Sequence, residues 1–430
     1  MRRLITMLGA MLVVSPATAA TFAIQAGRLI VDAAKSERGP STVIVENGRI
    51  VRIDVGATAP TGATVVDMRS KTVMPGMTDV HVHLTSTAGQ PWYEGMTPKY
   101  SGAYAATTGL HNALVMARAG FTTVRDLGSG PESGLAVRDA IREGAFPGPR
   151  VRVSGPALSM IGGHGDEAVG LNPQLAEAVS ARGQIGVCTG VDECSRAVRR
   201  IAATGVDVIK FHATGGVLDP GAMGLEQHFS DAEMTAIVST AHSLGLKTAA
   251  HAHGARGILA AVRAGVDSIE HGTFVDDAGV REMKARGTYY SATLMAFSGL
   301  NQFIGKGIFS ANSEAKARIA LAKWGVGLNK AYRGGVKIAL GTDSGVAPHG
   351  QANQEVGLMV SKGGMSIRDA LIAATKGGPD LMGLSGETGT LDAGKSADLI
   401  AVDGDPLADP AAVTRVAFVM VMGRPIPMKD

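Results

Sequence analysis

The sequence predicts an α/β protein: a (β/α)8 TIM barrel with a small β-sandwich formed by both chain ends. The first observation is a series of eight apolar strands between residues 76 and 385, several of them separated by amphipathic helical segments. The second is that residues 21–75 and 386–430 contain short strands joined by turns. Alternating βα units favour a parallel barrel, and all-β ends can pair with each other. The 430 residues, 45% of them hydrophobic, are enough for both parts.

Residues 1–20 have the features of a secretory signal peptide. Arg2 and Arg3 precede an apolar run over residues 4–14, and Ala17-Thr18-Ala19 resembles a cleavage site, with cleavage near Ala19 or Ala20. The apolar run is too short to span a bilayer. We therefore expect a periplasmic or secreted protein with no membrane span after cleavage. In such an oxidising compartment Cys188 and Cys194 can form a disulfide, and the sequence leaves open whether they do.

The two ends of the chain have the same sequence pattern of short strands joined by turns. At the N-terminal end "TFAIQAGRLIVDA", "STVIVENGRIVRIDVG" and "ATVVDMRSKTVMPG" read as strands, and "ENGRI" indicates a hairpin. At the C-terminal end "GTLDAGKSADLIAVDG" and "VAFVMVMGRPI" continue the pattern. We expect these segments to form one composite domain from residues 21–75 and 386–430.

The central part supplies the eight βα units of a hydrolase barrel over residues 76–385. Its predicted strands are "TDVHVHL", "FTTVRDLG", "RVRVSGPALS", "VDVIKFHATGG", "KTAAHAHG", "DSIEHGT", "TYYSATL" and "VKIALGTDSG". Helical segments between them include "DECSRAVRRIAATG", "DAEMTAIVSTAHSLG" and "ARGILAAVRAG". In such barrels catalytic side chains project from the C-terminal ends of the strands.

Polar side chains occur on five of these strands, where each would be costly to bury alone. Residues two apart on a strand share a face, so His81 and His83 point the same way, as do His251 and His253. A lone histidine is usually a satisfied core residue, but five strands delivering nitrogen or oxygen atoms to one mouth predict a metal site. The residues expected to hold metal are His81, His83, Lys210, His251, His271 and Asp343.

Imidazole and carboxylate ligands without thiolates suit two Zn²⁺ or other divalent ions. We expect His81, His83 and Asp343 to hold one ion, and His251 and His271 the other. A lysine ammonium would repel both ions. We therefore expect N6-carboxylated Lys210, a carbamate formed with CO₂, to bridge them.

The order of these residues along the chain is similar to that of a known superfamily. "PGMTDVHVHL", "TTVRDLG", "IKFHATGGV", "AHAHG", "SIEHGT" and "LGTDSG" together resemble the amidohydrolase superfamily, in the binuclear branch with a carboxylated lysine. More narrowly, the chain resembles the imidazolonepropionase-like group, which includes Xaa-Pro and Xaa-Arg dipeptidases and ochratoxin amidases. The resemblance covers nearly the whole mature chain. It implies the six ligands named above, with Asp343 also the catalytic general base.

The resemblance also suggests substrate contacts. His164, in "GGHGD", is similar to a histidine that binds the substrate carboxylate in this group. His251 fits the family's ligand position better than His253, which we expect to contact substrate, although both face inward. The full set of expected substrate-binding residues is His164, His253, His212, His228, Tyr289 and Tyr290.

These features predict hydrolysis of a dipeptide or N-acyl amino acid, with release of the C-terminal amino acid. A metal-dependent lactonase and an imidazolone-type cyclic amidohydrolase are the alternatives, because the same attacking water cleaves esters and cyclic amides. A deaminase is disfavoured, since Gly254 stands where that branch has a proton-shuttling glutamate. A zinc-binding protein without catalytic activity is disfavoured because Asp343, the expected general base, is present. The partner is thus a small amide substrate; the net charge of +3 gives no indication of nucleic acid binding, and a homo-oligomer is compatible with the sequence.

Overall fold

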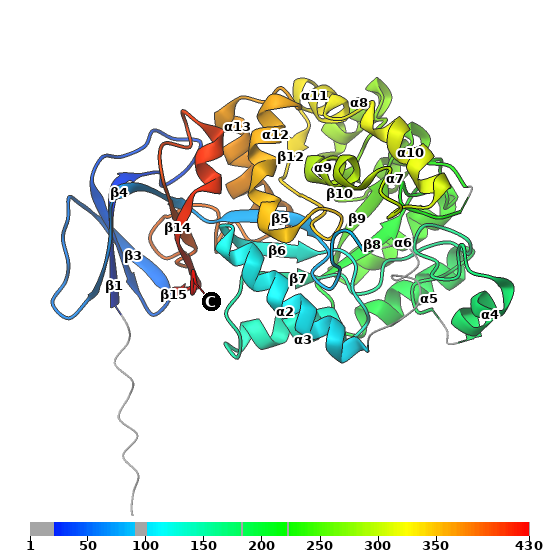
Figure 1. Cartoon of the computed structure of the whole chain (residues 1–430), viewed down its shortest axis with the longest axis horizontal. Helices are drawn as coiled ribbons and strands as arrows, with labels where there is room; N and C mark the ends of the chain where they lie inside the picture. The colour runs from blue at the N-terminus through cyan, green and yellow to red at the C-terminus, as the bar shows by residue number, and fades with distance from the viewer. Residues whose placement is uncertain (1–20, 91–100, 182–183, 222, 430) are drawn as a thin grey trace, which may run out of the picture.

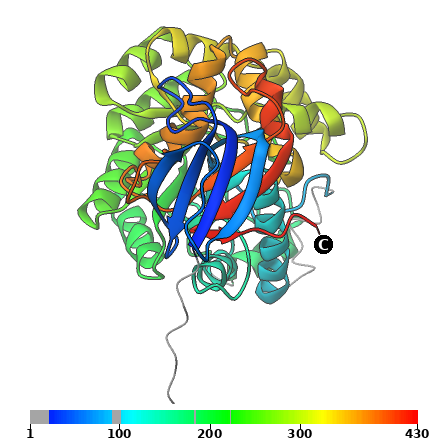
Figure 2. The same cartoon turned by 90° about the vertical axis from the view of Figure 1, so that its left-hand side faces the viewer.

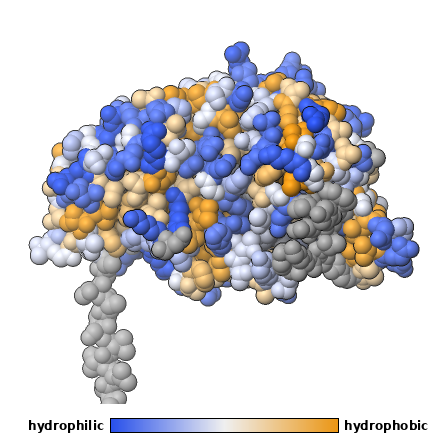
Figure 3. All heavy atoms as spheres, viewed as in Figure 1, coloured by the Kyte–Doolittle hydropathy of each residue, from blue (hydrophilic) through white to orange (hydrophobic). Residues whose placement is uncertain are grey.

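The computed structural model describes residues 21–90, 101–181, 184–221 and 223–429. The predicted signal peptide at residues 1–20 lies outside the described residues. Among the described residues, no helix is long and apolar enough to cross a membrane. On the face that Figure 3 presents, hydrophobic and hydrophilic residues are interspersed.

The two chain ends pair into one seven-stranded sheet at one flank of the molecule (Figures 1 and 2). Its strand order is β15 (Arg424–Pro425), β14 (Val416–Val421), β13 (Leu399–Val402), β4 (Thr64–Pro75), β1 (Thr21–Leu29), β2 (Ser41–Glu46) and β3 (Arg49–Val55). Strands β13 and β4 run antiparallel, with Leu399 opposite Pro75, so this contact joins the ends. The predicted pairing of the ends is therefore present. The described strands of the two ends form a single sheet, however, so the two stacked sheets of the predicted sandwich are not confirmed.

The predicted hairpin in this sheet forms for a local reason. Asn47 and Gly48 join β2 to β3, and both have positive φ, at 52° and 78°. A two-residue hairpin turn needs this left-handed conformation to match the twist of its strands, and Asn-Gly adopts it at little cost. The turn places the buried residues Val43, Val45 and Ile50 in the core of the sheet.

All eight strands predicted for the central part are present, and they are parallel. They are β5 (Met77–Val82), β6 (Phe121–Asp126), β7 (Arg150–Val153), β8 (Val208–His212), β9 (Lys247–Ala252), β10 (Ser268–His271), β11 (Tyr289–Ser291) and β12 (Lys337–Ile338). They form two sheets, a three-stranded one in the order β5-β6-β7 and a five-stranded one in the order β8-β9-β10-β11-β12. Isolated parallel bridges connect the two sheets at both of their edges. One joins Leu158, beyond β7, to Phe211 of β8, and the other joins Val82 of β5 to Ser344, beyond β12. Backbone bonds reinforce the second connection, because Asp343 N donates to His81 O at 2.7 Å.

Helices cover the outer side of these strands (Figure 1). They are α2 (Gly102–Arg118), α3 (Ser133–Arg142), α4 (Pro173–Ala181), α5 (Val191–Ala202), α6 (Asp231–Ser243), α7 (Ala255–Ala264), α8 (Asp277–Arg286), α9 (Leu294–Phe303), α10 (Ala311–Leu321), α11 (Val326–Arg333), α12 (Glu355–Ser361), α13 (Ile367–Ile372) and α14 (Gly378–Leu381), with the short turns η1 (His349–Gln354), η2 (Ala373–Gly377) and η3 (Pro410–Thr414). The three helices predicted at residues 192–205, 231–245 and 255–265 correspond to α5, α6 and α7.

A disulfide joins Cys188 to Cys194, which resolves the question that the sequence left open. Cys194 is on the buried face of α5, together with Ala197, Val198 and Ile201. Cys188 N donates to Ser159 O at 3.0 Å. The disulfide therefore ties the segment beyond β7, which leads to His164, to the start of α5.

Candidate metal centre

The C-terminal ends of the central strands surround one cavity of about 270 Å³. All six residues predicted as metal ligands line it, together with His164, His212 and His253. The strand ends explain the convergence, because the C-terminal ends of parallel strands lie at the same side of their sheets. His83 and His253 directly follow β5 and β9, and Asp343 lies in the loop five residues beyond the end of β12.

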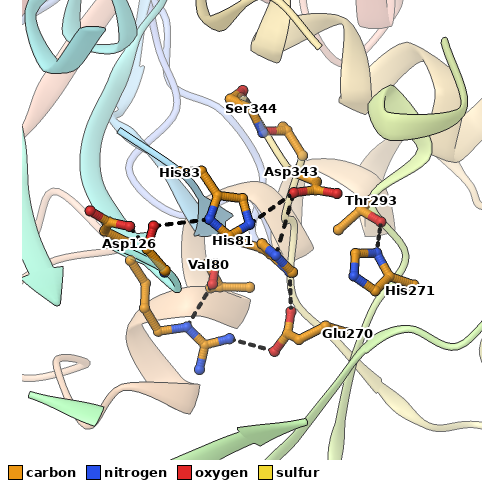
Figure 4. Close-up of polar contacts among 12 residues, drawn as sticks. Val80, His81, His83, Asp126, Glu270, His271, Thr293, Asp343 and Ser344 are labelled. Atoms are coloured by element: carbon orange, nitrogen blue, oxygen red, sulfur yellow. Dashed lines mark hydrogen bonds and ion pairs between the residues drawn. The ribbon is translucent and has the colours of Figure 1, made fainter. Parts of the chain in front are cut away.

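His81, His83 and Asp343 form the first cluster (Figure 4). Asp343 Oδ1 is 3.5 Å from His81 Nε2 and 3.2 Å from His83 Nε2. Burial opposes ionisation of Asp343, but the two imidazoles outweigh it and hold the pKa of the carboxyl well below its usual range. Asp343 is therefore an anion at neutral pH. Its Oδ1 nevertheless has no hydrogen-bond donor of suitable geometry, which is the state expected of an oxygen that binds a cation.

His251, His253 and His271 form the second cluster. The ring of His251 lies 4.7 Å from that of His253 and 4.6 Å from that of His271. Burial lowers the pKa of His251 and His271 well below the usual value and that of His253 to about 3. The rings are therefore neutral and keep a lone pair free for a metal ion. Since His253 lies in this cluster beside His251, the structure keeps both as candidate ligands.

Each histidine of the second cluster is oriented by a neighbouring oxygen. His271 Nδ1 is 2.7 Å from Thr293 Oγ1, and His253 Nδ1 is 2.8 Å from Thr273 Oγ1. His251 Nε2 is 3.3 Å from the carbonyl of Gly215. Contacts of this kind fix which ring nitrogen faces the site, as is usual for metal-binding histidines.

Lys210 lies on β8 in the same cavity and is 2% exposed. Within the described part of the chain, its ammonium makes no hydrogen bond or ion pair. Burial lowers its pKa to about 8, so a reactive neutral amine is accessible near physiological pH. A buried amine beside the two histidine clusters fits the carbamate expected from the sequence. The donor set as a whole fits two divalent cations.

A buried ion pair beneath the first cluster was not anticipated from the sequence. Arg125 Nη2 donates to Glu270 Oε1 at 2.7 Å, and Glu270 Oε2 is 3.0 Å from His81 Nδ1 (Figure 4). Arg125 Nε also donates to the carbonyl of Val80 at 2.6 Å. Burial raises the pKa of Glu270, but Arg125 and His81 outweigh it and hold the pKa at about 2. Glu270 thus fixes the ring of His81 so that Nε2 faces Asp343.

Three residues of the site have backbone conformations that are rare outside glycine. His271, Thr293 and Asp343 have φ values of 68°, 49° and 58°. A non-glycine residue in this region costs about 1–3 kcal/mol and persists where the surroundings enforce it. The strain is thus concentrated at two predicted ligands and at the residue that orients one of them.

His164 lies beside the second cluster and lines the same cavity. Its Nδ1 bonds to Asp219, and its ring lies 4.3 Å from that of His251 and 4.6 Å from that of His212. Burial opposes ionisation of Asp219, but His164 outweighs it and holds the pKa of the carboxyl at about 2. The imidazole is therefore anchored by an anion and has its other nitrogen available.

The remaining predicted substrate contacts do not line this cavity. Tyr290 donates its hydroxyl to the carbonyls of His271 and Gly272, at 2.8 and 3.2 Å, so it supports the site from behind. The hydroxyl of Tyr289 bonds to Asp380, and its ring packs with Val80 and Leu381, away from the histidines. The buried nitrogens of His228 have no hydrogen-bond partner among the described residues. His349 Nε2 lies 3.2 Å from the carbonyl of His83.

Part of the cavity wall is apolar. It is formed by Val217, Leu218, Ala296, Phe297, Leu300, Ala320 and Val346. Helix α9 supplies three of these residues, and four of the seven share a core cluster, namely Val217, Phe297, Leu300 and Ala320. The cavity is therefore polar at the strand ends and hydrophobic at the side of α9.

This geometry, with histidines and an aspartate at the strand ends around a buried lysine, corresponds to a known enzyme class. The chain belongs to the amidohydrolase family, whose model matches residues 72–426. It is therefore an amidohydrolase, in agreement with the resemblance predicted from the motifs.

Three relatives show which members of the family the chain is similar to. The chain is similar to ochratoxinase of Aspergillus niger, with 36% identity over 376 residues, which cover 81% of this chain and 75% of the ochratoxinase. Among solved structures it is similar to a Xaa-Pro dipeptidase with bound methionine, with a TM-score of 0.87, 33% identity and coverage of 94% and 99% of the two chains. It is also similar to a prolidase in complex with N-methylphosphonate-L-proline, with a TM-score of 0.85, 30% identity and coverage of 95% and 100%.

Proposed function

We propose that this protein is a binuclear-metal amidohydrolase that cleaves the amide bond of dipeptides or N-acyl amino acids and releases the C-terminal amino acid. The observation that carries the proposal is that two ligand clusters and Lys210 share one cavity with an apolar wall. The similarity to ochratoxinase and to prolidase structures supports the same reaction. We further propose that the eight strands close into a barrel and that residues 1–20 direct export.

The residues that would hold two divalent cations, preferably Zn²⁺, are His81, His83 and Asp343 on one side and His251 and His271 on the other, with carboxylated Lys210 between them. Bound cations would supply Lewis-acid chemistry, polarising the amide carbonyl and acidifying the attacking water. The pKa values of His81, His251 and His271, lowered by burial, suit such a site, because these imidazoles need not lose a proton at neutral pH. Burial opposes the charge of His83, but Asp343 outweighs it and raises the pKa of His83, so His83 would give up a proton when it binds a cation.

Asp343 is the proton carrier of the proposed reaction. Its carboxylate accepts a proton from the attacking water as the new C–O bond forms. It then gives that proton to the amide nitrogen as the C–N bond breaks, so that a neutral amine leaves. The low pKa of Asp343 ensures that the carboxylate is ionised before attack, and the imidazoles of His81 and His83 keep it directed into the cavity.

His164 is the proposed contact for the substrate carboxylate. Asp219 anchors one ring nitrogen, and the other donates to a bound anion when both ring nitrogens carry a proton. This contact selects a free C-terminal carboxylate and holds the scissile amide in a reactive position. The apolar wall on α9 is then available to a hydrophobic side chain or acyl group.

The test is a screen of dipeptides and N-acyl amino acids with purified protein, following the released amino acid, together with elemental analysis. We expect about two divalent ions per chain and turnover of substrates that have a free C-terminal carboxylate. The matched control is Asp343→Asn, which removes the proton carrier. A metal-loaded protein that turns over lactones but no amide would contradict the proposal.

A further inference from the structure

A buried carboxyl group at the start of α12 has no part in the mechanism above. Glu355 is 1% exposed, and burial raises the pKa of its carboxyl group to about 8, against the effect of two backbone hydrogen bonds. Its two oxygens accept hydrogen bonds from the backbone N–H groups of Leu294 at 2.8 Å and Met295 at 2.7 Å. These are the first two residues of α9, so Glu355 caps this helix from another part of the chain.

The reason for this external cap lies at Thr293. Threonine before a helix normally uses its hydroxyl to cap the first free N–H groups. Here the side chain of Thr293 makes no capping bond, and its backbone is left-handed, with φ of 49° and ψ of 49°. The hydroxyl lies instead 2.7 Å from His271 Nδ1 (Figure 4). Because Thr293 orients a candidate ligand, the free end of α9 needs another acceptor.

Helix α9 connects both halves of the cavity. Its N-terminus follows the residue that orients His271, and its Ala296, Phe297 and Leu300 form part of the apolar wall. A shift of α9 would therefore move Thr293 away from His271 and change the shape of the apolar wall at the same time. Glu355 is the group that bonds to the end of α9 closest to the ligand.

We propose that Glu355 is a positioning residue for the metal centre: by capping α9 in place of Thr293, it frees the threonine hydroxyl to hold His271 in its ligand orientation. The proposal rests on the metal-binding role of His271 in the proposed function. It assigns Glu355 no contact with substrate or with the reacting atoms. Its effect passes through α9 and Thr293.

The experiment measures metal affinity and stability for a set of variants of the full chain. Glu355→Gln keeps the size of the side chain but offers one acceptor and presents an amide N–H to the second backbone donor. Thr293→Val removes the hydroxyl at His271, and Thr293→Ser restores it. The control is Asp276→Ala, which removes the cap bond of α8 to Gly279 on an exposed helix outside the cavity. Each variant is titrated with Zn²⁺ against a competing chelator and unfolded thermally.

We expect Glu355→Gln and Thr293→Val each to weaken the binding of one of two Zn²⁺ ions by about tenfold or more, the size typical for partners of metal ligands. The double variant should be no weaker than the worse single variant, because both changes break one chain of contacts. Thr293→Ser should bind zinc as the wild type does, and Asp276→Ala should lose stability only.

Two results would overturn the proposal. If Glu355→Gln lowers the melting temperature but binds both zinc ions as tightly as the wild type, Glu355 has a structural role alone. If the losses of affinity in the two single variants add in the double variant, Glu355 does not act through Thr293. A wild type that binds no zinc at all would instead refute the proposed function, and this inference with it.

Discussion

The buried pair of Arg125 and Glu270 gives the sharpest test of how the site is held in place. Replacing Glu270 with glutamine removes the charge but keeps an acceptor for His81 Nδ1. Arg125, which is 1% exposed, is then left as a buried guanidinium without a counter-ion. Removing one partner of a buried ion pair typically costs about 3–5 kcal/mol of folding free energy.

The pKa of Glu270 gives an independent figure of similar size. Its fall from 4.5 to about 2 corresponds to roughly 3 kcal/mol of preference for the charged form in the folded protein, at about 1.4 kcal/mol per pH unit. Because the folded pKa is lowered, this contribution is fully present above pH 4.5 and is lost as the pH falls towards 2. We therefore expect the stability difference between wild type and Glu270→Gln to shrink below pH 4.5.

The assay is urea unfolding of the metal-free protein at several pH values for Glu270→Gln, Arg125→Met and the double variant. We expect each single variant to lose about 3 kcal/mol and the double variant to lose less than the sum, with a coupling of about 2 kcal/mol or more. Additive losses, or a stability difference that stays constant from pH 7 to pH 3, would refute the reasoning that the two charges stabilise each other.

Further predictions concern the reaction, the substrate and the disulfide. Asp343→Asn should lower kcat by at least about 100-fold, as measured with any turned-over dipeptide, and unchanged kcat would exclude it as the proton carrier. His164→Gln should raise KM for substrates with a free C-terminal carboxylate but not for their C-terminal amides; equal effects on both would show that it does not bind the carboxylate. Leu300→Ala should lower kcat/KM about tenfold for an apolar side chain at the α9 wall and leave the glycine analogue nearly unchanged, whereas equal losses would indicate general damage. Replacing Cys188 and Cys194 together with serine should cost about 2 kcal/mol in urea unfolding, because the closed loop is short, and a reductant should affect the wild type but not this variant.

The sequence predicted the parts of the molecule that repeat or alternate. Each central strand was recognisable as an apolar run, and the i, i+2 spacing placed His81 and His83 on one face. The Asn47-Gly48 turn was recognisable because few residue pairs adopt its conformation. For these features the information is local, so neighbouring residues suffice to predict them.

The contacts across the cavity could not be predicted in the same way. Glu270 adjoins His271 in "SIEH", yet no pattern indicates that it meets His81 and Arg125, which are far away in the sequence. Thr293 and Glu355 look like an ordinary helix cap and an ordinary helical glutamate. Tyr289 and Tyr290 were expected to contact substrate, but the hydroxyl of Tyr289 bonds to Asp380 and that of Tyr290 to two backbone carbonyls. Only the three-dimensional arrangement determines these partners.

The pairing of β4 with β13 affects how the protein is made. During synthesis, one edge of β4 has no neighbour until residues 399–402 have left the ribosome, more than 300 residues later. A strand edge with free N–H and C=O groups attracts other strands, including those of other chains. A nascent or truncated chain that ends before β13 therefore exposes an unpaired strand edge on β4. Aggregation should increase sharply in any product that stops short of residue 399.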